Sequence, residues 1–303
     1  MSDSNTRGVL HLCLGVFVFS LQDAVIKHVS GDYALTQVLA IRCLVAVPIL
    51  LALVQFEVGW RGLVSAEFPA VLARAAILFL SYTFYYLAFP ALPLVYAVAL
   101  YFTVPLFVTA LAGPILREYS GPRVWAAIAI GFIGVLIILR PGSRLFEPAA
   151  FLSLLSACMY AIAMLMARRL GSVASTSVMS FHQNWVYLVA ALLLALLASA
   201  SGLADKVEHP SLVFLFRPWV WPTLRDALLI ASCGVIAAVG IMFLTNAYRI
   251  ARANLVTSFE YTGVLWAPLW GFLFFAEVPR LTTVMGGLLI VGAGLVALRL
   301  GKR

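Results

Sequence analysis

Charged residues are scarce in this chain, at 11% of 303 residues, whereas soluble proteins carry about 25%. Hydrophobic residues make up 64% of the sequence, against about 45–50% in soluble proteins. Alternation with the two-residue period of strands is also missing, which argues against a transmembrane β-barrel. The sequence therefore excludes a soluble domain and predicts an all-α, polytopic membrane protein.

Residues that commonly bind metals or carry out catalysis are few and scattered. The four cysteines lie in apolar stretches without metal-ligand spacing, so we expect packing residues and no disulfide framework. No H-E-x-x-H, G-x-S-x-G or P-loop motif is present. We therefore predict no enzyme, no metal and no cofactor. The first apolar stretch lacks a small-residue cleavage site, so no cleavable signal peptide is expected.

Ten apolar windows are long enough to cross a bilayer as helices, which takes about 17–25 residues each. They lie near residues 8–28, 33–56, 70–90, 92–116, 121–140, 148–170, 176–200, 224–249, 253–276 and 280–300. The longest connection between windows, residues 201–223, is expected to be an outer loop.

Lysine and arginine are enriched in cytoplasmic loops of membrane proteins. With the N-terminus inside, twelve of them, Arg74 included, fall on the inner side and seven on the outer side. We therefore predict a multi-pass protein of a bacterial-type inner membrane with both termini cytoplasmic. The net charge of +8 reflects this topology rather than binding to nucleic acid.

Residues 88–142 are echoed in register by residues 247–301. At this single offset the polar matches are Thr103/Thr262, Glu118/Glu277 and Arg140/Arg299. A weaker echo places residues 8–42 beside 149–183. Each copy then holds five spans, an odd number, so the second copy enters the membrane inverted. We predict two inverted five-helix repeats, 1–145 and 146–303, around a central cavity.

Three segments carry a resemblance to a known family: LAIRCLVAVPILL, PLFVTALAGPILREYSGPR and FEYTGVLWAPLWGFLFFAEVPR. They resemble the EamA-type ten-helix members of the drug/metabolite transporter superfamily, whose repeats each end the fourth helix on a glutamate. Here those glutamates are Glu118 and Glu277, although Arg117 and Ala276 replace the glycine that usually precedes them. The chain looks most like the YddG-type amino-acid exporters, which implies export of amino acids, aromatic ones included.

Ionisable groups inside spans are costly and are therefore functional candidates. Arg42 can bind a substrate carboxylate through two hydrogen bonds, or it can be a structural arginine paired with a carboxylate or with helix-end carbonyls. Glu260 and His182 are expected at similar depth, where they can bind a substrate ammonium or relay a proton. A glutamate that only bonds a neighbouring helix is the alternative for Glu260.

A set of aromatic and polar residues accompanies these ionisable groups. Tyrosine and tryptophan offer an apolar body with one hydrogen-bonding tip, which suits amphipathic solutes. The predicted substrate-binding residues are Gln22, Arg42, Tyr82, Tyr86, Tyr101, His182, Trp185, Glu260, Tyr261 and Trp266. For any one of them, packing between helices is the alternative. Glu118 and Glu277 are predicted to be structural, because each precedes the proline and arginine that begin the next helix.

The sequence thus predicts a secondary transporter that exports amino acids, aromatic and other neutral ones, by alternating access. The alternative is an exporter of other small metabolites or drugs, with or without proton coupling. A membrane-embedded enzyme with His182 and Glu260 as acid and base is a weaker rival, and a channel is disfavoured because no repeated filter-like loop is visible. The expected partners are a small-molecule substrate and the lipid bilayer, with no nucleic acid and no obligatory protein partner.

Overall fold

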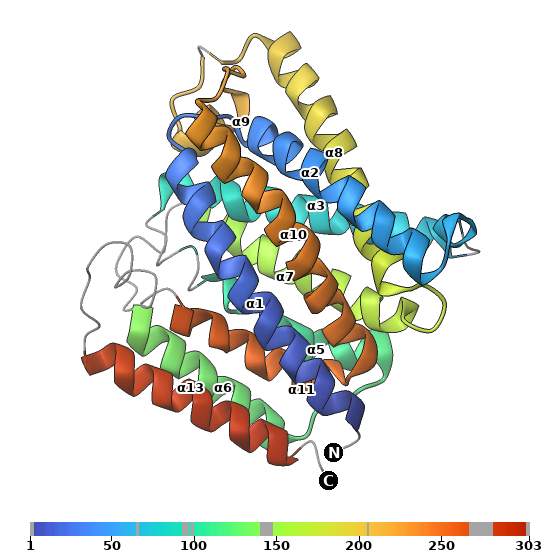
Figure 1. The fold of residues 1–303 in the computed structure, drawn as a ribbon. Coiled ribbons are helices and arrows are strands. Elements are labelled where there is room, and N and C mark those ends of the chain that lie inside the picture. The colour runs from blue at the N-terminus through green and yellow to red at the C-terminus, as the bar shows by residue number, and fades with distance from the viewer. Residues whose placement is uncertain are drawn as a thin grey trace.

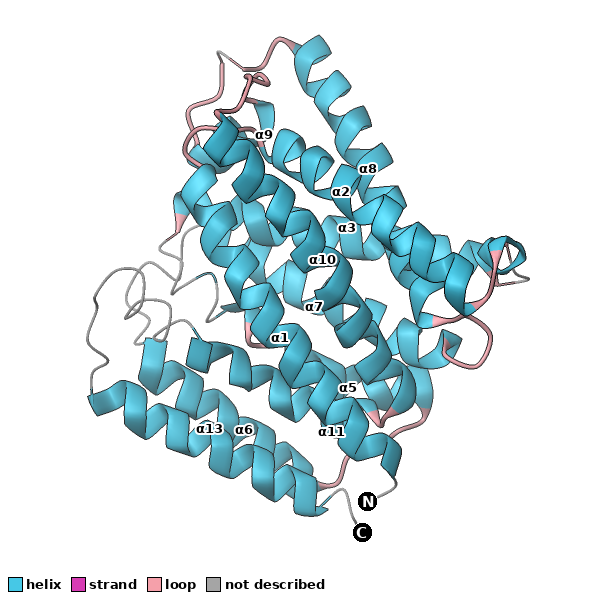
Figure 2. Ribbon diagram, viewed as in Figure 1, coloured by secondary structure: helices cyan, strands magenta, loops and turns pink. Residues whose placement is uncertain are grey.

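The computed structural model describes residues 3–64, 67–92, 97, 100–139, 148–204, 206–266 and 281–300. All secondary structure in these ranges is helical, as Figure 2 shows and as the sequence predicted. The elements in chain order are α1 (Asp3–Val29), α2 (Leu35–Glu57), η1 (Trp60–Leu63), α3 (Phe68–Ala91), α5 (Val104–Leu116), α6 (Pro122–Leu139), α7 (Pro148–Leu170), α8 (Thr176–Ser201), α9 (Pro210–Phe216), α10 (Leu224–Ile250), α11 (Ala253–Val256), η3 (Thr257–Thr262) and α13 (Leu281–Leu300).

Six of the described helices are long and apolar enough to cross a membrane, by length and composition. They are α1, α2, α3, α7, α8 and α10. Shorter apolar helices are α5 and parts of α6 and α13. Each predicted span contains a described helix: the fourth contains α5, and the ninth contains the short elements α11 and η3. The chain is therefore a polytopic α-helical membrane protein, as expected from its hydropathy.

The long helices pack in pairs that cross between the two halves of the chain. Helix α1 lies along α10, and α3 lies along α7 (Figure 1). Helix α2 packs on α8, and α6 packs on α13 away from the other pairs. Suppose that α1, α2, α3 and α6 correspond to α7, α8, α10 and α13, respectively. A two-fold axis between the repeats would then exchange the pair α1–α10 with the pair α3–α7, and it would map the pairs α2–α8 and α6–α13 onto themselves.

Both chain ends lie on one side of the molecule, at the bottom of Figure 1. We call the side on which α1 begins and α2 ends the terminal face; it also carries η1 and the connections 117–121 and 171–175, toward the right and lower right of Figure 1. The opposite side, the distal face, carries the turn 30–34 and the connection 217–223. Ends on the same side are what an even number of crossings requires.

At the distal face, the connection 217–223 lies against the start of α2. The side chain of Gln37 donates to the carbonyl of Val220 (2.6 Å) and accepts from its backbone N–H (3.2 Å). Tyr33, in the turn before α2, donates to the Asp226 carboxylate at 2.7 Å. This hydrogen bond raises the pKa of the Tyr33 phenol. The turn between α1 and α2 is thus tied to the second half of the chain.

At the terminal face, Glu118 links three segments. Its Oε1 accepts from Arg168 Nε of α7 at 3.2 Å, and its Oε2 accepts from the backbone N–H of Ala253 at 3.2 Å. Arg168 also donates to the carbonyl of Arg249 at the end of α10. The helix start that Glu118 contacts is that of α11, not that of α6 as the sequence suggested. Its predicted counterpart, Glu277, lies outside the described residues.

Replacement of Glu118 by alanine is expected to lower the free energy of unfolding by about 1–2 kcal/mol. The loss combines a partly exposed ion pair with the contact at the start of α11. Thermal melting in detergent measures the effect, with Glu67→Ala as the matched control because Glu67 is exposed and makes no capping hydrogen bond. Equal melting temperatures for the two variants would contradict the linking role of Glu118.

Candidate functional site

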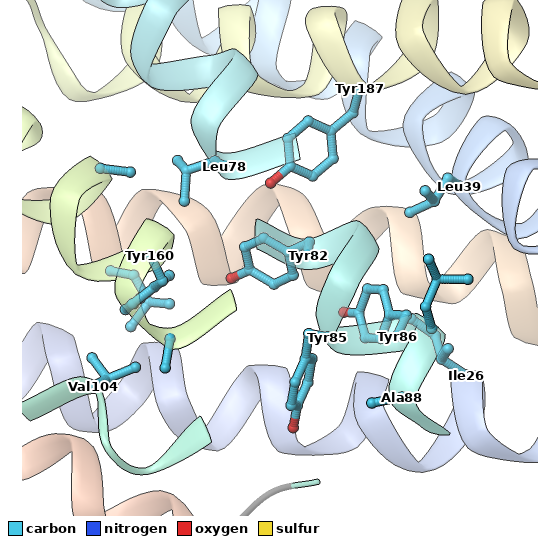
Figure 3. Close-up of a cluster of buried hydrophobic side chains, with 14 of the residues drawn as sticks. Ile26, Leu39, Leu78, Tyr82, Tyr85, Tyr86, Ala88, Val104, Tyr160 and Tyr187 are labelled. Carbon is cyan, nitrogen blue, oxygen red and sulfur yellow. The ribbon is translucent and has the colours of Figure 1, made fainter. Parts of the chain in front are cut away.

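Six tyrosines from both halves of the chain meet inside the helices. This tyrosine cluster consists of Tyr82, Tyr85, Tyr86, Tyr101, Tyr160 and Tyr187, five of which are labelled in Figure 3. Tyr82 is central: its ring centroid lies 5.9 Å from that of Tyr86, 6.4 Å from that of Tyr160 and 6.0 Å from that of Tyr187. Tyr82 and Tyr86 meet because residues four apart share one helix face.

Arg42 of α2 lies against this cluster and is only 2% exposed. Its guanidinium carbon lies 5.4 Å from the centroid of the Tyr187 ring, within the range of a cation–π contact. With the Gln22 amide turned to satisfy its neighbours, Gln22 accepts from Arg42 Nη1 (3.2 Å) and from Tyr86 (2.7 Å), and donates to the Cys233 carbonyl (3.1 Å).

No carboxylate forms an ion pair with Arg42 among the residues that the structure describes, and its Nε has no hydrogen-bond partner. An uncompensated buried charge costs several kcal/mol, so it is retained where an anion can neutralise it. The structural role that the sequence left open, pairing with a carboxylate, is therefore not found in the described part of the chain.

Arg74 is a second buried arginine, although the sequence counted it only among the charges of the inner side. It belongs to α3 and is fully buried. Its Nε, Nη1 and Nη2 donate to the Ala163 carbonyl (3.1 Å), Gln183 Oε1 (3.5 Å) and Thr245 Oγ1 (3.1 Å). These partners are neutral and come from α7, α8 and α10. Because Arg74 lies only six residues into α3, hydropathy alone could not separate it from the preceding loop.

Two carboxylates lie near the tyrosine cluster, and neither forms an ion pair with a residue in the described ranges. Glu260 of η3 is 5% exposed, and its Oε1 accepts from Tyr248 at 2.9 Å and from Tyr160 at 3.3 Å. Asp23 of α1 accepts from Tyr85 at 3.4 Å. Since phenols are neutral donors, either carboxylate can still bind a ligand ammonium.

His182 and Trp185 of α8 make no hydrogen bond or ring contact with this cluster in the described chain, although His182 is only 5% exposed. The ring of His182 packs edge-on against Phe68 and Phe181, each at 5.2 Å. With Trp185, which is 47% exposed, these residues line an apolar hollow of about 470 Å³. The predicted pairing of His182 with Glu260 is therefore not found: Glu260 is held by tyrosines, and His182 by phenylalanines.

Tyr261 and Trp266 also point away from the tyrosine cluster. Tyr261 belongs to a separate hydrophobic cluster between η3, α6 and α13, where it packs against Phe102. Its ring lies so close to Gly131 of α6 that an added Cβ would meet it at 2.6 Å. Trp266 packs edge-on against Phe17 of α1 at 4.7 Å.

The matched glycines Gly131 and Gly292 test this contact. We expect Gly131→Ala to lower the free energy of unfolding by about 1–3 kcal/mol, because the new methyl group displaces the Tyr261 ring. The same change at Gly292 of α13, where nothing lies within 4 Å, should be neutral or stabilising. Thermal melting of both variants measures the difference in stability. A Gly131→Ala variant with an unchanged melting temperature would contradict the close contact between Gly131 and the Tyr261 ring.

Of the predicted site residues, the structure brings six together: Gln22, Arg42, Tyr82, Tyr86, Tyr101 and Glu260. Sequence reasoning missed Arg74, Tyr160, Tyr187 and Tyr248 as site residues. Their available signal was a polar or phenolic side chain inside a predicted span. In the described ranges, no group of three histidine, cysteine, aspartate or glutamate side chains could hold a metal ion.

Comparisons with known proteins find transporters similar to this chain. Residues 6–140 match the model of the EamA-like transporter family. The pseudopaline exporter of Pseudomonas aeruginosa is 28% identical, over 97% of this chain and 97% of its own. The riboflavin transporter of Vibrio cholerae is 28% identical, over 94% of this chain and 90% of its own. The S-adenosylmethionine uptake transporter of Rickettsia prowazekii is 22% identical, over 95% and 91%.

The fold is shared with a solved protein as well. A crystal structure with 19% sequence identity superimposes with a TM-score of 0.80 and covers 98% of this chain and 99% of the other. Residues 6–140 thus carry the EamA-type resemblance seen in the sequence, and the relatives that align along nearly the whole chain are named transporters. The narrower resemblance to aromatic amino-acid exporters is not reflected in the names of these relatives.

Proposed function

We propose that this chain is a membrane transporter like its EamA-type relatives and that it exports amino acids, aromatic and other neutral ones. The observation that carries the proposal is the buried guanidinium of Arg42, which lacks a carboxylate partner in the described chain and touches the tyrosine cluster. A guanidinium binds a carboxylate through two parallel hydrogen bonds, which fixes orientation as well as charge.

The other end of an amino acid fits the remaining groups. Among the described residues, the carboxylates of Glu260 and Asp23 accept hydrogen bonds only from phenols, so they can accept an ammonium group. The faces of Tyr82 and its neighbours suit an apolar or aromatic side chain, with offset or edge-on stacking. One guanidinium, free carboxylates and aromatic walls together favour a small zwitterion over a simple cation or anion.

Alternating access between two inverted repeats is the mechanism we propose. The pairs α1–α10 and α3–α7, each formed between the two halves of the chain, support it. So do the equivalent hydrogen bonds made by Thr103 and Thr262, which occupy matching positions of the sequence repeat. Each threonine hydroxyl donates at 2.7 Å to the carbonyl three residues before it. Contacts at Glu118 and at Gln37 join the two halves at opposite faces. Exchange of such contacts between the faces would open the centre to each side in turn.

Topology and direction complete the proposal. The excess of lysine and arginine on the terminal face favours a cytoplasmic location for both chain ends, in an inner membrane. Outward transport is supported by the resemblance to exporters and by one relative that is named an exporter. A second candidate, transport of another small metabolite with or without proton coupling, is favoured by relatives named for riboflavin and S-adenosylmethionine.

Ligand-induced stabilisation tests the substrate class. A ligand present at 100 times its dissociation constant stabilises a protein by about 2.7 kcal/mol. We expect L-phenylalanine to raise the melting temperature of the purified protein in lipid nanodiscs, and L-phenylalaninamide, which lacks the carboxylate, to raise it much less. Stabilisation by riboflavin with no response to any amino acid would favour the second candidate.

A further inference from the structure

The two buried arginines lie at different depths in the bundle. Arg42 follows the distal end of α2 by seven residues, which is about 10 Å along a helix. Its partner Gln22 lies seven residues before the distal end of α1. Arg74 follows the terminal end of α3 by six residues, about 9 Å. Its partner Gln183 lies seven residues after the terminal end of α8.

Each half of the bundle also holds one of the two carboxylates. Asp23 lies six residues before the distal end of α1, in the half that contains Arg42. Glu260 accepts from Tyr248, which lies two residues before the terminal end of α10 and so belongs to the half that contains Arg74. The guanidinium and carboxylate of each half do not form an ion pair with each other in the described structure.

A continuous series of tyrosine contacts connects the distal half of the bundle to its terminal half. Tyr82 touches Tyr86 on the distal side and Tyr160 on the terminal side. Gln183, which accepts from Arg74, donates to the Tyr187 hydroxyl at 3.4 Å. The Tyr187 ring in turn faces Arg42.

We propose that Arg74 and Glu260 form a second binding station for zwitterionic solutes, on the terminal half, distinct from a distal station at Arg42 and Asp23. The inference rests on the proposed function. A guanidinium has five N–H donors, and Arg74 uses three of them. Two donors therefore remain for a substrate carboxylate, and Glu260 remains for the ammonium group.

A purely structural role does not explain the charge of Arg74. Its three acceptors are a backbone carbonyl, an amide oxygen and a hydroxyl oxygen, all of them neutral. A neutral donor would satisfy such acceptors without the cost of burying a cation. Its partners also all belong to the second half of the chain, while Arg74 belongs to the first. Relative movement of the two halves of the chain would therefore change which N–H donors of Arg74 are left without a partner.

Inhibition measured separately on each side of the membrane tests the second binding station. Vesicles of known orientation are assayed for transport of labelled L-phenylalanine, with unlabelled L-phenylalanine or L-phenylalaninamide as inhibitor on one side at a time. The wild type should bind L-phenylalanine about tenfold or more tightly than L-phenylalaninamide on both sides. This is the difference expected from one charge-assisted hydrogen bond. Arg74→Gln should lose this preference on the terminal side and keep it on the distal side, and Arg42→Gln should do the reverse.

Control variants separate binding from folding. Arg169→Gln makes the same change at an exposed arginine on the terminal side and should leave both preferences intact. If Arg74→Gln does not fold, Arg74→Lys serves instead, because it keeps the charge and loses the fork of donors. Its acid preference should fall on the terminal side alone, and an unchanged preference there would overturn the station.

The outcomes also distinguish this inference from the proposed function. A folded Arg74→Gln protein with a lower maximal rate but an intact acid preference on both sides would make Arg74 structural and overturn the second station. A wild type without any preference for the acid on either side would instead overturn the proposed binding of carboxylates at Arg42.

Discussion

Arg42→Gln is expected to lower amino-acid transport at low substrate concentration about 100-fold, the largest effect of any single change in this chain. A charge-assisted hydrogen bond contributes about 1.5–3 kcal/mol, and a bidentate carboxylate contact makes two of them. Glutamine replaces neither the charge nor the fork of donors. Uptake into proteoliposomes at several substrate concentrations measures the loss, which should appear mainly as a higher KM.

The same variant should fold as well as the wild type. Because no carboxylate pairs with Arg42 in the described residues, its removal leaves no buried anion behind, and the cost of burying the cation disappears. The exposed Arg61 offers a control, since Arg61→Gln should change neither transport nor melting. A strong drop in the melting temperature of Arg42→Gln with normal transport would instead identify Arg42 as structural.

Glu260→Gln is expected to give the second largest effect, a loss of about tenfold or more in transport at low substrate concentration. The change removes the negative charge that would bind the substrate ammonium while keeping an acceptor for Tyr160 and Tyr248. Tyr160→Phe and Tyr248→Phe each remove one neutral hydrogen bond of about 1 kcal/mol, so a smaller loss of about fivefold is expected.

His182→Gln is the contrasting variant for Glu260→Gln. His182 packs between phenylalanines and has no hydrogen bond or ring contact with the tyrosine cluster among the described residues, so we expect transport within about twofold of the wild type. Initial rates at a fixed substrate concentration and at two pH values compare the variants. An equally large loss in His182→Gln would restore the functional pairing of His182 and Glu260 that the sequence suggested.

The helical membrane fold could be predicted because burial in lipid leaves a strong trace in composition. Every backbone polar group in the hydrocarbon layer must be bonded within the chain, so long apolar runs can only be helices there. The same scarcity of charge made Arg42 and Glu260 visible as candidates, since each is an isolated ionisable residue in an apolar run.

The direction in which each helix turns its side chains could not be predicted. Lipid and protein interior are both apolar, so hydropathy does not separate the lipid-facing side of a span from its packed side. His182 and Trp185 for this reason looked like site residues, although in the described structure they line an apolar hollow with Phe68 and Phe181 and not the tyrosine cluster. Tyr160 and Tyr187 were overlooked for the same reason, although both point into the tyrosine cluster.

The distinction between a loop arginine and a buried arginine was also beyond the sequence. Arg74 lies six residues inside α3, close enough to the span boundary to be counted with the cytoplasmic loops. Only its partners Ala163, Gln183 and Thr245, distant in the sequence, show that it is enclosed. Depth near a span end depends on tertiary contacts, which a hydropathy window does not contain.

Counterflow in proteoliposomes tests most directly the central claim, that the tyrosine cluster with Arg42 carries amino acids by alternating access. Liposomes loaded with unlabelled L-phenylalanine are diluted into a trace of labelled L-phenylalanine, without any imposed ion gradient. The account predicts a transient accumulation of label that saturates, favours the L over the D form and is lost in Arg42→Gln. An absence of counterflow with every amino acid tested, while labelled riboflavin exchanges in the same liposomes, would contradict it.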